Sequence, residues 1–154
     1  MSADQRLKEL GITLPSSTAP AANYANAVRS GNLLFLAGKA PRAEGGKLPK
    51  GRLGREFTAE QGYAFARSAA LDLIAVMRGE LGSLDRVARV VEVQGFLNAT
   101  PEFEEHAKVL DGCSDLLVEV FEKRGVHARS VFGASSLRGG LPVIIKAVVE
   151  IAEK

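Results

Sequence analysis

The chain has 154 residues and a formal net charge of +2, and 46% of its residues are hydrophobic and 25% are charged. That length suits one compact domain with its own core, so we predict a single domain over residues 1–154. The net charge is small and the lysines and arginines are scattered, which excludes the dense basic patch typical of a nucleic-acid-binding protein.

Signals for secretion, membrane insertion or disulfide bonding are not found in the sequence. The first residues mix acids and bases without an apolar stretch, unlike a secretory signal, and no apolar run approaches the roughly 20 residues of a membrane span. The single cysteine, Cys113, excludes an intrachain disulfide and fits a reducing compartment. We therefore expect a cytoplasmic protein without a membrane partner.

The N-terminal third of the chain predicts a helix, a strand and a long loop. A short amphipathic helix and a loop make up an N-terminal extension over residues 1–18. Residues 32–38 are an apolar run that Gly38 ends, and they predict a strand. The glycine-rich segment 41–54 predicts a hairpin connection with a short strand around Arg52–Leu53.

Two long helices and three strands are predicted for the rest of the chain. Thr58 and Gln61 have the spacing of a capping box, so a helix begins there and ends at Gly82. Thr100 followed by Pro101 resembles an N-cap with proline at the first helical position, and predicts a second helix that ends at Gly125. The predicted strands cover residues 88–98, 129–133 and 141–151.

This order of elements predicts an α+β fold, a mainly antiparallel sheet with the helices on one face. Alternate residues of the last strand are uniformly apolar and are expected to face the helices: Val143, Ile145, Ala147, Val149 and Ile151. The opposite face is mixed: Ile144, Lys146, Val148 and Glu150. In the strand 88–98 we expect Val91, Val93 and Leu97 on the helix side, and Val90, Glu92, Gln94 and Phe96 on the other. A mixed face suits a subunit interface; a solvated face with a few apolar residues is the alternative.

Few residue types in the chain suit metal or nucleophilic chemistry. His106 and His127 lie 21 positions apart with no cysteine pair nearby, so no metal site is predicted. Cys113 falls in the middle of a predicted helix and is interpreted as a packing residue. The serines at 130, 135 and 136 lack a nucleophile elbow, and the glycines of segment 45–51 lack the spacing of a phosphate loop.

Arg129 is the strongest candidate for ligand binding, because the apolar residues Val131 and Phe132 follow it two and three positions later. A guanidinium held against apolar surface needs an anion or carbonyl partner, and a carboxylate accepts its two-pronged donor set. Two interpretations stay open from the residues alone. Arg129 is either a fixed anion receptor or an arginine whose stem covers the surface at the end of a strand.

Four segments, in this order, resemble the RidA/YjgF family, also called endoribonuclease L-PSP. They are APAANYANAVRSGNLLFLAGKAP (19–41), GSLDRVARVVEVQGFLN (82–98), HARSVFGASSL (127–137) and PVIIKAVVEIA (142–152). The resemblance covers roughly residues 20 to 151. Because of its N-terminal extension and its long second helix, the chain resembles a divergent branch of the family.

The resemblance implies a chorismate-mutase-like fold and a homotrimer whose sheets pack around a central axis, with ligand sites in the clefts between subunits. It implies hydrolysis of enamine and imine acids, such as 2-aminoacrylate, to 2-keto acids and ammonia, with no metal or cofactor. By position, Arg129 matches the family's carboxylate-binding arginine, Tyr24 its pocket tyrosine and Gly38 the turn whose backbone lines the pocket. The other implied substrate contacts are Lys39, Ser130 and Val131.

Two positions depart from the pattern of active deaminases. Val131 replaces a cysteine, and Lys146 replaces the last-strand glutamate that positions or activates water, a role that a charged lysine cannot take. Arg129 and Lys146 are thus the candidate catalytic positions. Two functions stay open: a deaminase of 2-imino acids, or a trimer that binds a small carboxylate without catalysis or with different chemistry. A ribonuclease has no support, since paired histidines, a basic groove and an aromatic stacking set are not found.

Overall fold

The computed structural model describes residues 2–17 and 19–153. Residues 1 and 154, the ends of the predicted domain, and residue 18, the end of the predicted extension, lie outside the described residues. The helices are α1 (Ala3–Glu9), α2 (Ala59–Leu81) and α3 (His106–Phe121), with short 3-10 turns η1 (Leu84–Arg86), η2 (Glu122–Gly125) and η3 (Arg138–Gly140). The strands are β1 (Ala27–Ser30), β2 (Leu33–Lys39), β3 (Val87–Asn98), β4 (Ala128–Ala134) and β5 (Val143–Ile151).

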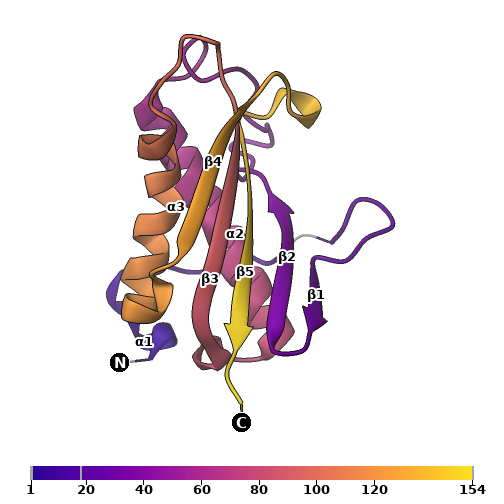
Figure 1. Cartoon of the computed structure of the whole chain (residues 1–154), viewed down its shortest axis with the longest axis vertical. Helices are drawn as coiled ribbons and strands as arrows, with labels where there is room; N and C mark the ends of the chain where they lie inside the picture. The colour runs from indigo at the N-terminus through magenta and orange to yellow at the C-terminus, as the bar shows by residue number, and fades with distance from the viewer. Residues whose placement is uncertain (1, 18, 154) are drawn as a thin grey trace.

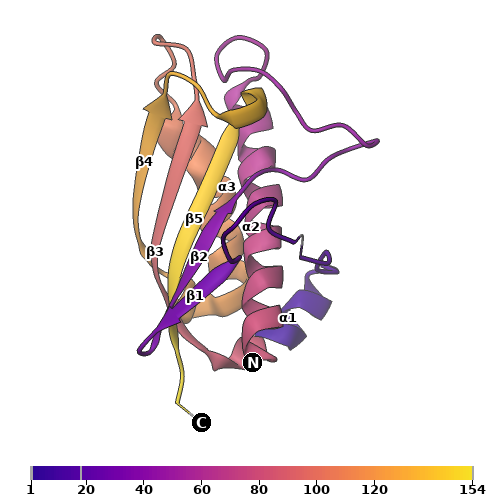
Figure 2. The same cartoon turned by 90° about the vertical axis from the view of Figure 1, so that its right-hand side faces the viewer.

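One sheet and one layer of helices form the described part of the chain (Figure 1). The strand order is β1-β2-β5-β3-β4, and every neighbouring pair is antiparallel except β3 and β4, which are parallel. Helices α2 and α3 cover one face of the sheet, and over the described ranges no helix covers the other (Figure 2). The predicted α+β class, with a mainly antiparallel sheet and helices on one face, is confirmed.

Local signals set both ends of α2. The Thr58 hydroxyl accepts a hydrogen bond from the Gln61 amide at 3.1 Å, and the Gln61 side chain accepts one from the Thr58 amide at 2.8 Å. Gly82 ends the helix with φ +81°, a left-handed conformation that favours glycine. Both predicted boundaries of this helix are confirmed.

The predicted start of the second long helix at Thr100–Pro101 is wrong, because α3 begins at His106. Long-range hydrogen bonding explains the difference. The Thr100 amide donates to the carbonyl of Leu53 at 3.0 Å, and the Phe103 amide folds back onto Thr100 in a turn at 3.1 Å. Binding to the distant loop thus holds residues 100–103 in a turn, and the helix starts only after it.

Two strand predictions at the N-terminal side also need correction. The short strand expected around Arg52–Leu53 is only a pair of isolated bridges from Leu53 to Phe57 and Ala99. The strand that forms a hairpin with β2 is instead β1, which was not predicted because it has four mostly exposed residues. A tight turn with Gly31 at φ +60° connects the two strands, consistent with the glycine preference of hairpin turns.

A pairing irregularity in β3 reverses one predicted assignment of faces. The register between β3 and β5 shifts between Val90 and Glu92, and alternation of the side chains breaks there. Val90 is fully buried and Val91 is 36% exposed, the opposite of the prediction. The assignment of the predicted core face of β5 is confirmed, since all five of its apolar residues are buried: Val143, Ile145, Ala147, Val149 and Ile151.

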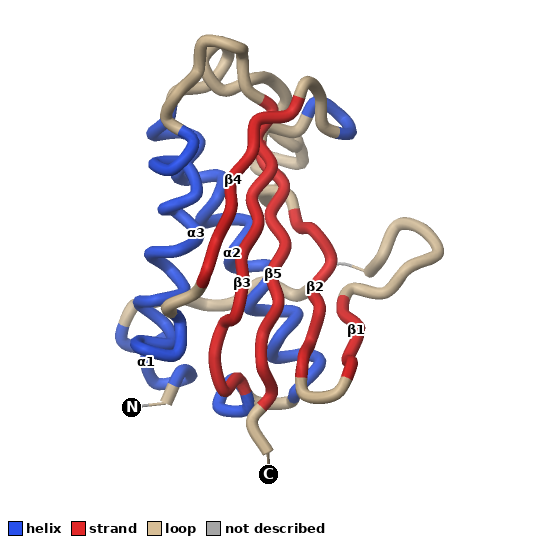
Figure 3. The backbone as a smooth tube through the Cα atoms, in the orientation of Figure 1, coloured by secondary structure: helices blue, strands red, loops and turns tan. Residues whose placement is uncertain are grey.

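Several of the loops meet at one end of the sheet, at the top of Figure 3. There the Gly51 amide donates to the Gly140 carbonyl, and the Leu53 amide donates to the Asn98 carbonyl, both at 2.9 Å. These bonds join the segment after β2 to the ends of β3 and η3. They hold in place the loop segments around the cavities described below.

Gly112 permits the close approach of α3 to α2. A Cβ at this position would overlap the carbonyl oxygen of Tyr63 and lie 2.9 Å from its carbon, which is backbone that cannot move aside. We expect Gly112→Ala to destabilise the fold by about 1–3 kcal/mol through overpacking. Gly79→Ala is the matched control, because nothing lies within 4 Å of its added methyl group, and it should stabilise by about 0.5–1 kcal/mol. Denaturant unfolding measures both changes, and equal shifts would contradict the assignment.

Candidate functional site

Three of the predicted ligand-binding residues line one cavity of about 470 Å³, which we call the Lys39 cavity. Tyr24 comes from the segment before β1, and Gly38 and Lys39 come from the end of β2. The other charged residues in its lining are Arg42, Asp72 and Arg138. A phenol, three basic side chains and one carboxylate therefore meet around a space of metabolite size.

A shift in strand pairing places Lys39 in this cavity. The register between β2 and β5 changes between Leu36 and Lys39, and Lys39 is only 8% exposed, like the core residues before it on the strand. Its Nζ donates to the Oδ1 of Asn26 at 2.9 Å. This hydrogen bond holds the side chain of Lys39 at the wall of the cavity.

Asp72 is the second buried charge at this site. It belongs to the buried side of α2, and its Oδ1 receives no hydrogen bond from any residue in ranges 2–17 and 19–153. Burial raises the pKa of the Asp72 carboxyl, and the positive charges of Lys39 and Arg42 partly offset this. Sequence reasoning missed Asp72, although a lone carboxylate within the apolar run 69–77 was a visible signal.

The predicted residues Arg129, Ser130 and Val131 lie on β4, at the opposite edge of the sheet from β1 and β2. A single chain therefore does not bring them to the Lys39 cavity. Arg129 pairs with Val93 and Val131 pairs with Gly95, so both point to the helix side of the sheet. Ser130 points to the side that no described helix covers.

The guanidinium of Arg129 lies against α3, a contact that neither sequence interpretation included. Its Nη1 lies 2.9 Å from the Oδ1 of Asp111 and donates to the Ser114 hydroxyl at 3.0 Å, and its Nη2 donates to the Ala107 carbonyl at 3.4 Å. The side chain remains 27% exposed. Asp111 and Ser114 are three positions apart on one helical face, but the sequence did not show that this face meets β4.

His127 completes this hydrogen-bonded group. Its Nδ1 lies 2.6 Å from the Gly125 carbonyl and its Nε2 lies 2.9 Å from the Ser114 hydroxyl. Burial lowers the pKa of His127, the hydrogen bond to the Gly125 carbonyl partly offsets this, and the charge of Arg129 lowers it further. When the His127 ring is neutral and its Nδ1–H donates to the Gly125 carbonyl, its Nε2 has no hydrogen. Nε2 therefore accepts a hydrogen bond from the Ser114 hydroxyl. The group thereby fixes Arg129 in one position.

Lys146 lies on the side of the sheet that no described helix covers, which we call the open sheet face. It pairs with Gln94 of β3, which in turn pairs with Ser130 of β4, so a polar row crosses three strands. An apolar row lies on either side of it. One row contains Val28, Phe35 and Val148 and continues to Glu92 of β3, and the other contains Ile144, Phe96 and Phe132.

Comparison with known proteins shows which family has this arrangement. The family described as "YjgF/chorismate mutase-like, putative endoribonuclease" matches residues 4–145. The chain belongs to this family. "Protein TCP17" of Trypanosoma cruzi is 42% identical over 146 residues, which cover 94% of this chain and 91% of that protein.

Two solved structures support the membership of this YjgF-family chain. Protein Atu1372 of Agrobacterium tumefaciens, of unknown function, is 38% identical with a TM-score of 0.87, over 97% of this chain and 92% of that one. A "putative endoribonuclease" of Shewanella oneidensis is 32% identical with a TM-score of 0.93, over 97% of this chain and 99% of that one. The RidA/YjgF resemblance and the expected fold are thus confirmed.

A more distant structure has the same fold. RidA of an Antarctic Psychrobacter is 22% identical with a TM-score of 0.61, over 90% of this chain and 98% of that one. This likeness extends the shared fold to a protein with much lower sequence identity.

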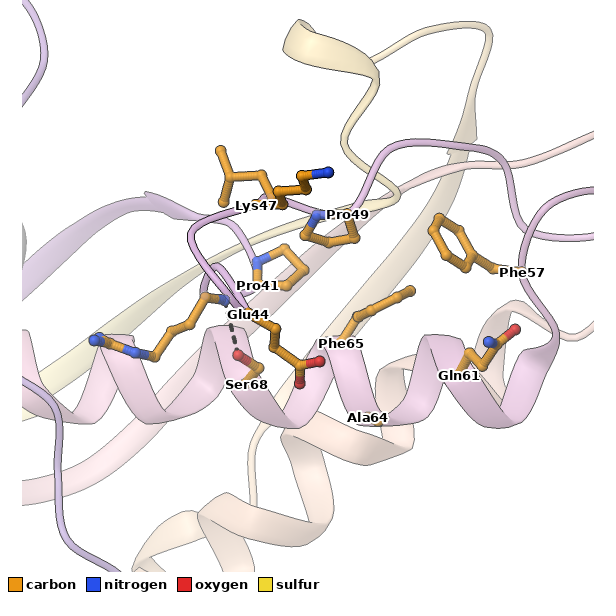
Figure 4. Close-up of a pocket in the computed structure, with 11 residues that line it drawn as sticks. Pro41, Glu44, Lys47, Pro49, Phe57, Gln61, Ala64, Phe65 and Ser68 are labelled. Carbon is orange, nitrogen blue, oxygen red and sulfur yellow. Dashed lines mark hydrogen bonds between the residues drawn. The ribbon is translucent and has the colours of Figure 1, made fainter.

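A second cavity of the YjgF-family chain adjoins the Lys39 cavity (Figure 4). It has a volume of about 480 Å³ and lies between α2 and the loop after β2. The rings of Phe57 and Phe65 meet edge to face at 4.8 Å, and the Arg42 amide donates to the Ser68 hydroxyl at 2.8 Å. Arg42 lines both cavities, and Glu44 and Lys47 also line the second one, so two cavities with charged side chains lie next to each other.

Other candidate chemistry in the chain is limited. Cys113 is fully buried, and burial raises the pKa of its thiol to about 12, so it is chemically inert in the folded protein. Within ranges 2–17 and 19–153 no three His, Cys, Asp or Glu side chains come together in a way that could hold a metal ion. Over the same ranges, no helix has the length and apolar character needed to cross a membrane.

Proposed function

We propose that this YjgF-family protein binds a small organic carboxylate, and the Lys39 cavity is the observation that carries the proposal. Three cationic side chains, Lys39, Arg42 and Arg138, surround a partly enclosed space of about 470 Å³. Low-dielectric walls strengthen the attraction of such cations for an anion. Tyr24 also lines this cavity, and its phenol is a neutral hydrogen-bond donor.

We further propose that three copies of the chain assemble and that the site lies between subunits. The exposed apolar rows of the open sheet face support self-association, since Phe35 is 45% and Phe132 is 50% exposed. In such an assembly the β4 edge of one subunit, with Arg129, Ser130 and Val131, faces the Lys39 cavity of its neighbour. This arrangement would bring together the two halves of the family pattern that one chain keeps apart.

Calorimetric titration with 2-oxobutyrate tests the proposed carboxylate binding. We expect saturable binding that weakens as the salt concentration rises, because the cations of the Lys39 cavity attract the carboxylate. The matched probe is 2-oxobutanamide, which keeps the carbon skeleton but lacks the negative charge. Equal affinity for 2-oxobutyrate and 2-oxobutanamide would reject the proposal, and so would a failure to bind both 2-oxobutyrate and its amino analogue 2-aminobutyrate at millimolar concentration.

Catalysis is proposed to be slow because of Lys146. General acid–base groups contribute about 10²–10⁴-fold, so we expect 2-iminobutyrate to be hydrolysed at least about 10²-fold more slowly than by family members with a glutamate there. Lys146→Glu should raise the rate, and Lys146→Gln, which removes the charge without supplying a carboxylate, should not. The assay couples an amino acid oxidase, which supplies the imine, to detection of the 2-keto acid.

Two outcomes would contradict the role proposed for Lys146. A wild-type rate as high as in glutamate-containing members would show that another group activates water. Equal rates for Lys146→Glu and Lys146→Gln would show that position 146 does not contact the reacting atoms. The first outcome would count against the non-catalytic alternative, and the second would reject the role proposed for Lys146.

The proposal for compartment and partners follows from the same features. A buried free thiol at Cys113 suits a reducing environment, so we propose the cytoplasm. The formal charge of +2 gives no electrostatic reason for a nucleic-acid partner. The partners proposed are therefore a second and third copy of the chain and a small carboxylate.

A further inference from the structure

We propose that Asp72 of α2 is a specificity-determining residue that binds the nitrogen of an α-amino or α-imino acid in the Lys39 cavity. This inference rests on the proposed function, because it requires the ligand's carboxylate to bind in the same cavity. It adds a residue whose role is to distinguish nitrogen-containing acids from 2-keto acids.

The burial of Asp72 needs an explanation in the first place. It is 5% exposed, and its neighbours Leu73 and Ala70 are fully buried. A carboxylate in an apolar stretch of helix costs free energy unless hydrogen bonds compensate it. The part of Asp72 that is not covered by core residues lines the Lys39 cavity.

One oxygen of this carboxylate has unused hydrogen-bonding capacity. Oδ1 of Asp72 is buried, and no donor from the described residues reaches it. Burial is also the main influence on the pKa of Asp72 and raises it, so the nearby cations Lys39 and Arg42 do not fully compensate the charge. A hydrogen-bond donor on a bound ligand would supply the hydrogen bond that this oxygen lacks.

The charges around the cavity suggest how such a ligand lies. Arg42 and Arg138 are positioned to attract a carboxylate, and Asp72 is the only carboxylate among the described residues that line the cavity. An α-amino or α-imino acid has an anionic group and a cationic N–H group on adjacent carbons. A charge-assisted hydrogen bond from that nitrogen to Asp72 is stronger than a neutral one.

A 2-keto acid has the same carboxylate but only acceptors at the next carbon. Its carbonyl oxygen would face the Asp72 carboxylate without a proton between them. A site built to accept a hydrogen bond discriminates strongly against a ligand that lacks the donor, because the buried polar group then stays unpaired. Asp72 thereby favours the nitrogen-containing acid over the keto acid.

The experiment compares 2-aminobutyrate with 2-oxobutyrate, which share one carbon skeleton, by calorimetric titration of the full-length protein. We expect the wild type to bind the amino acid about 10- to 100-fold more tightly. Asp72→Asn should reduce this ratio, and Asp72→Leu should abolish or invert it. Glu80→Gln, an exposed carboxylate change on the same helix, should leave the ratio unchanged.

Each outcome decides between the inference and the proposed function. If 2-oxobutyrate binds but the wild type shows no preference for 2-aminobutyrate, carboxylate binding stands and the role of Asp72 is rejected. A preference that survives in both Asp72 variants also rejects it. Failure of the wild type to bind either acid rejects both proposals. Thermal denaturation shows whether the variants fold. Asp72→Asn removes a buried charge and is expected to fold. Loss of the fold would make Asp72 a structural residue and would overturn the inference.

Discussion

Phe35→Asp is expected to convert the proposed homotrimer, with three times the 16.3 kDa mass of the chain, into monomers. Phe35 lies in the apolar row of the open sheet face, directly opposite Val28 on one side and Val148 on the other. Burying an unpaired carboxylate at the centre of such a row costs several kcal/mol, more than a single interface contact supplies. Light scattering at micromolar concentration measures the mass.

The control for this change is Val118→Asp. Val118 is an exposed apolar residue of α3, on the helix side of the molecule, so its substitution should leave the trimer intact. Circular dichroism should show that both variants fold. A monomeric wild type, or a trimer that survives Phe35→Asp, would show that the open sheet face is not the interface.

The sequence predicted those parts of the fold that depend on neighbouring residues. The ends of α2 follow from Thr58 and Gly82, whose caps form within one helical turn. The start of α3 could not be predicted in this way. It is displaced by the hydrogen bond from Thr100 to Leu53, which joins residues 47 positions apart in the sequence.

Strand pairing explains the other differences. The reversal of Val90 and Val91 follows from an irregularity in the pairing of β3 with β5, which no alternation of residue types in β3 reveals. Lys39 reaches the helix side of the sheet through a similar shift in β2. Both features depend on the partner strand, so they become visible only when the sheet is assembled.

The candidate site was predictable only in part for the same reason. The resemblance to the RidA/YjgF family grouped Tyr24, Gly38 and Lys39, and these three residues do line one cavity. The Asp111 partner of Arg129 was missed because it requires knowing which helix covers β4. Asp72 was missed although its type and its apolar surroundings in the sequence were in view.

Arg129→Ala is expected to weaken the binding of 2-oxobutyrate by about 2–4 kcal/mol, because it removes a charge-assisted pair from a partly desolvated site. Arg129→Lys should not restore full affinity, since an ammonium lacks the two-pronged geometry. The trimer should survive both changes. Calorimetric titration and size-exclusion chromatography are needed together, because monomers would make a loss of binding uninformative about contact with the ligand.

The contact of Arg129 with α3 allows a second test, in which a substitution is expected to strengthen the binding of 2-oxobutyrate instead of weakening it. Asp111 lies 2.9 Å from the guanidinium and competes with a ligand carboxylate for the same donors. If Arg129 anchors the ligand, Asp111→Asn releases its charge and should strengthen binding of 2-oxobutyrate. If Arg129 only holds β4 against α3, Asp111→Asn should lower the melting temperature and leave the affinity unchanged. Equal affinity in the wild type, both Arg129 variants and Asp111→Asn, with the trimer intact, would limit Arg129 to a structural contact.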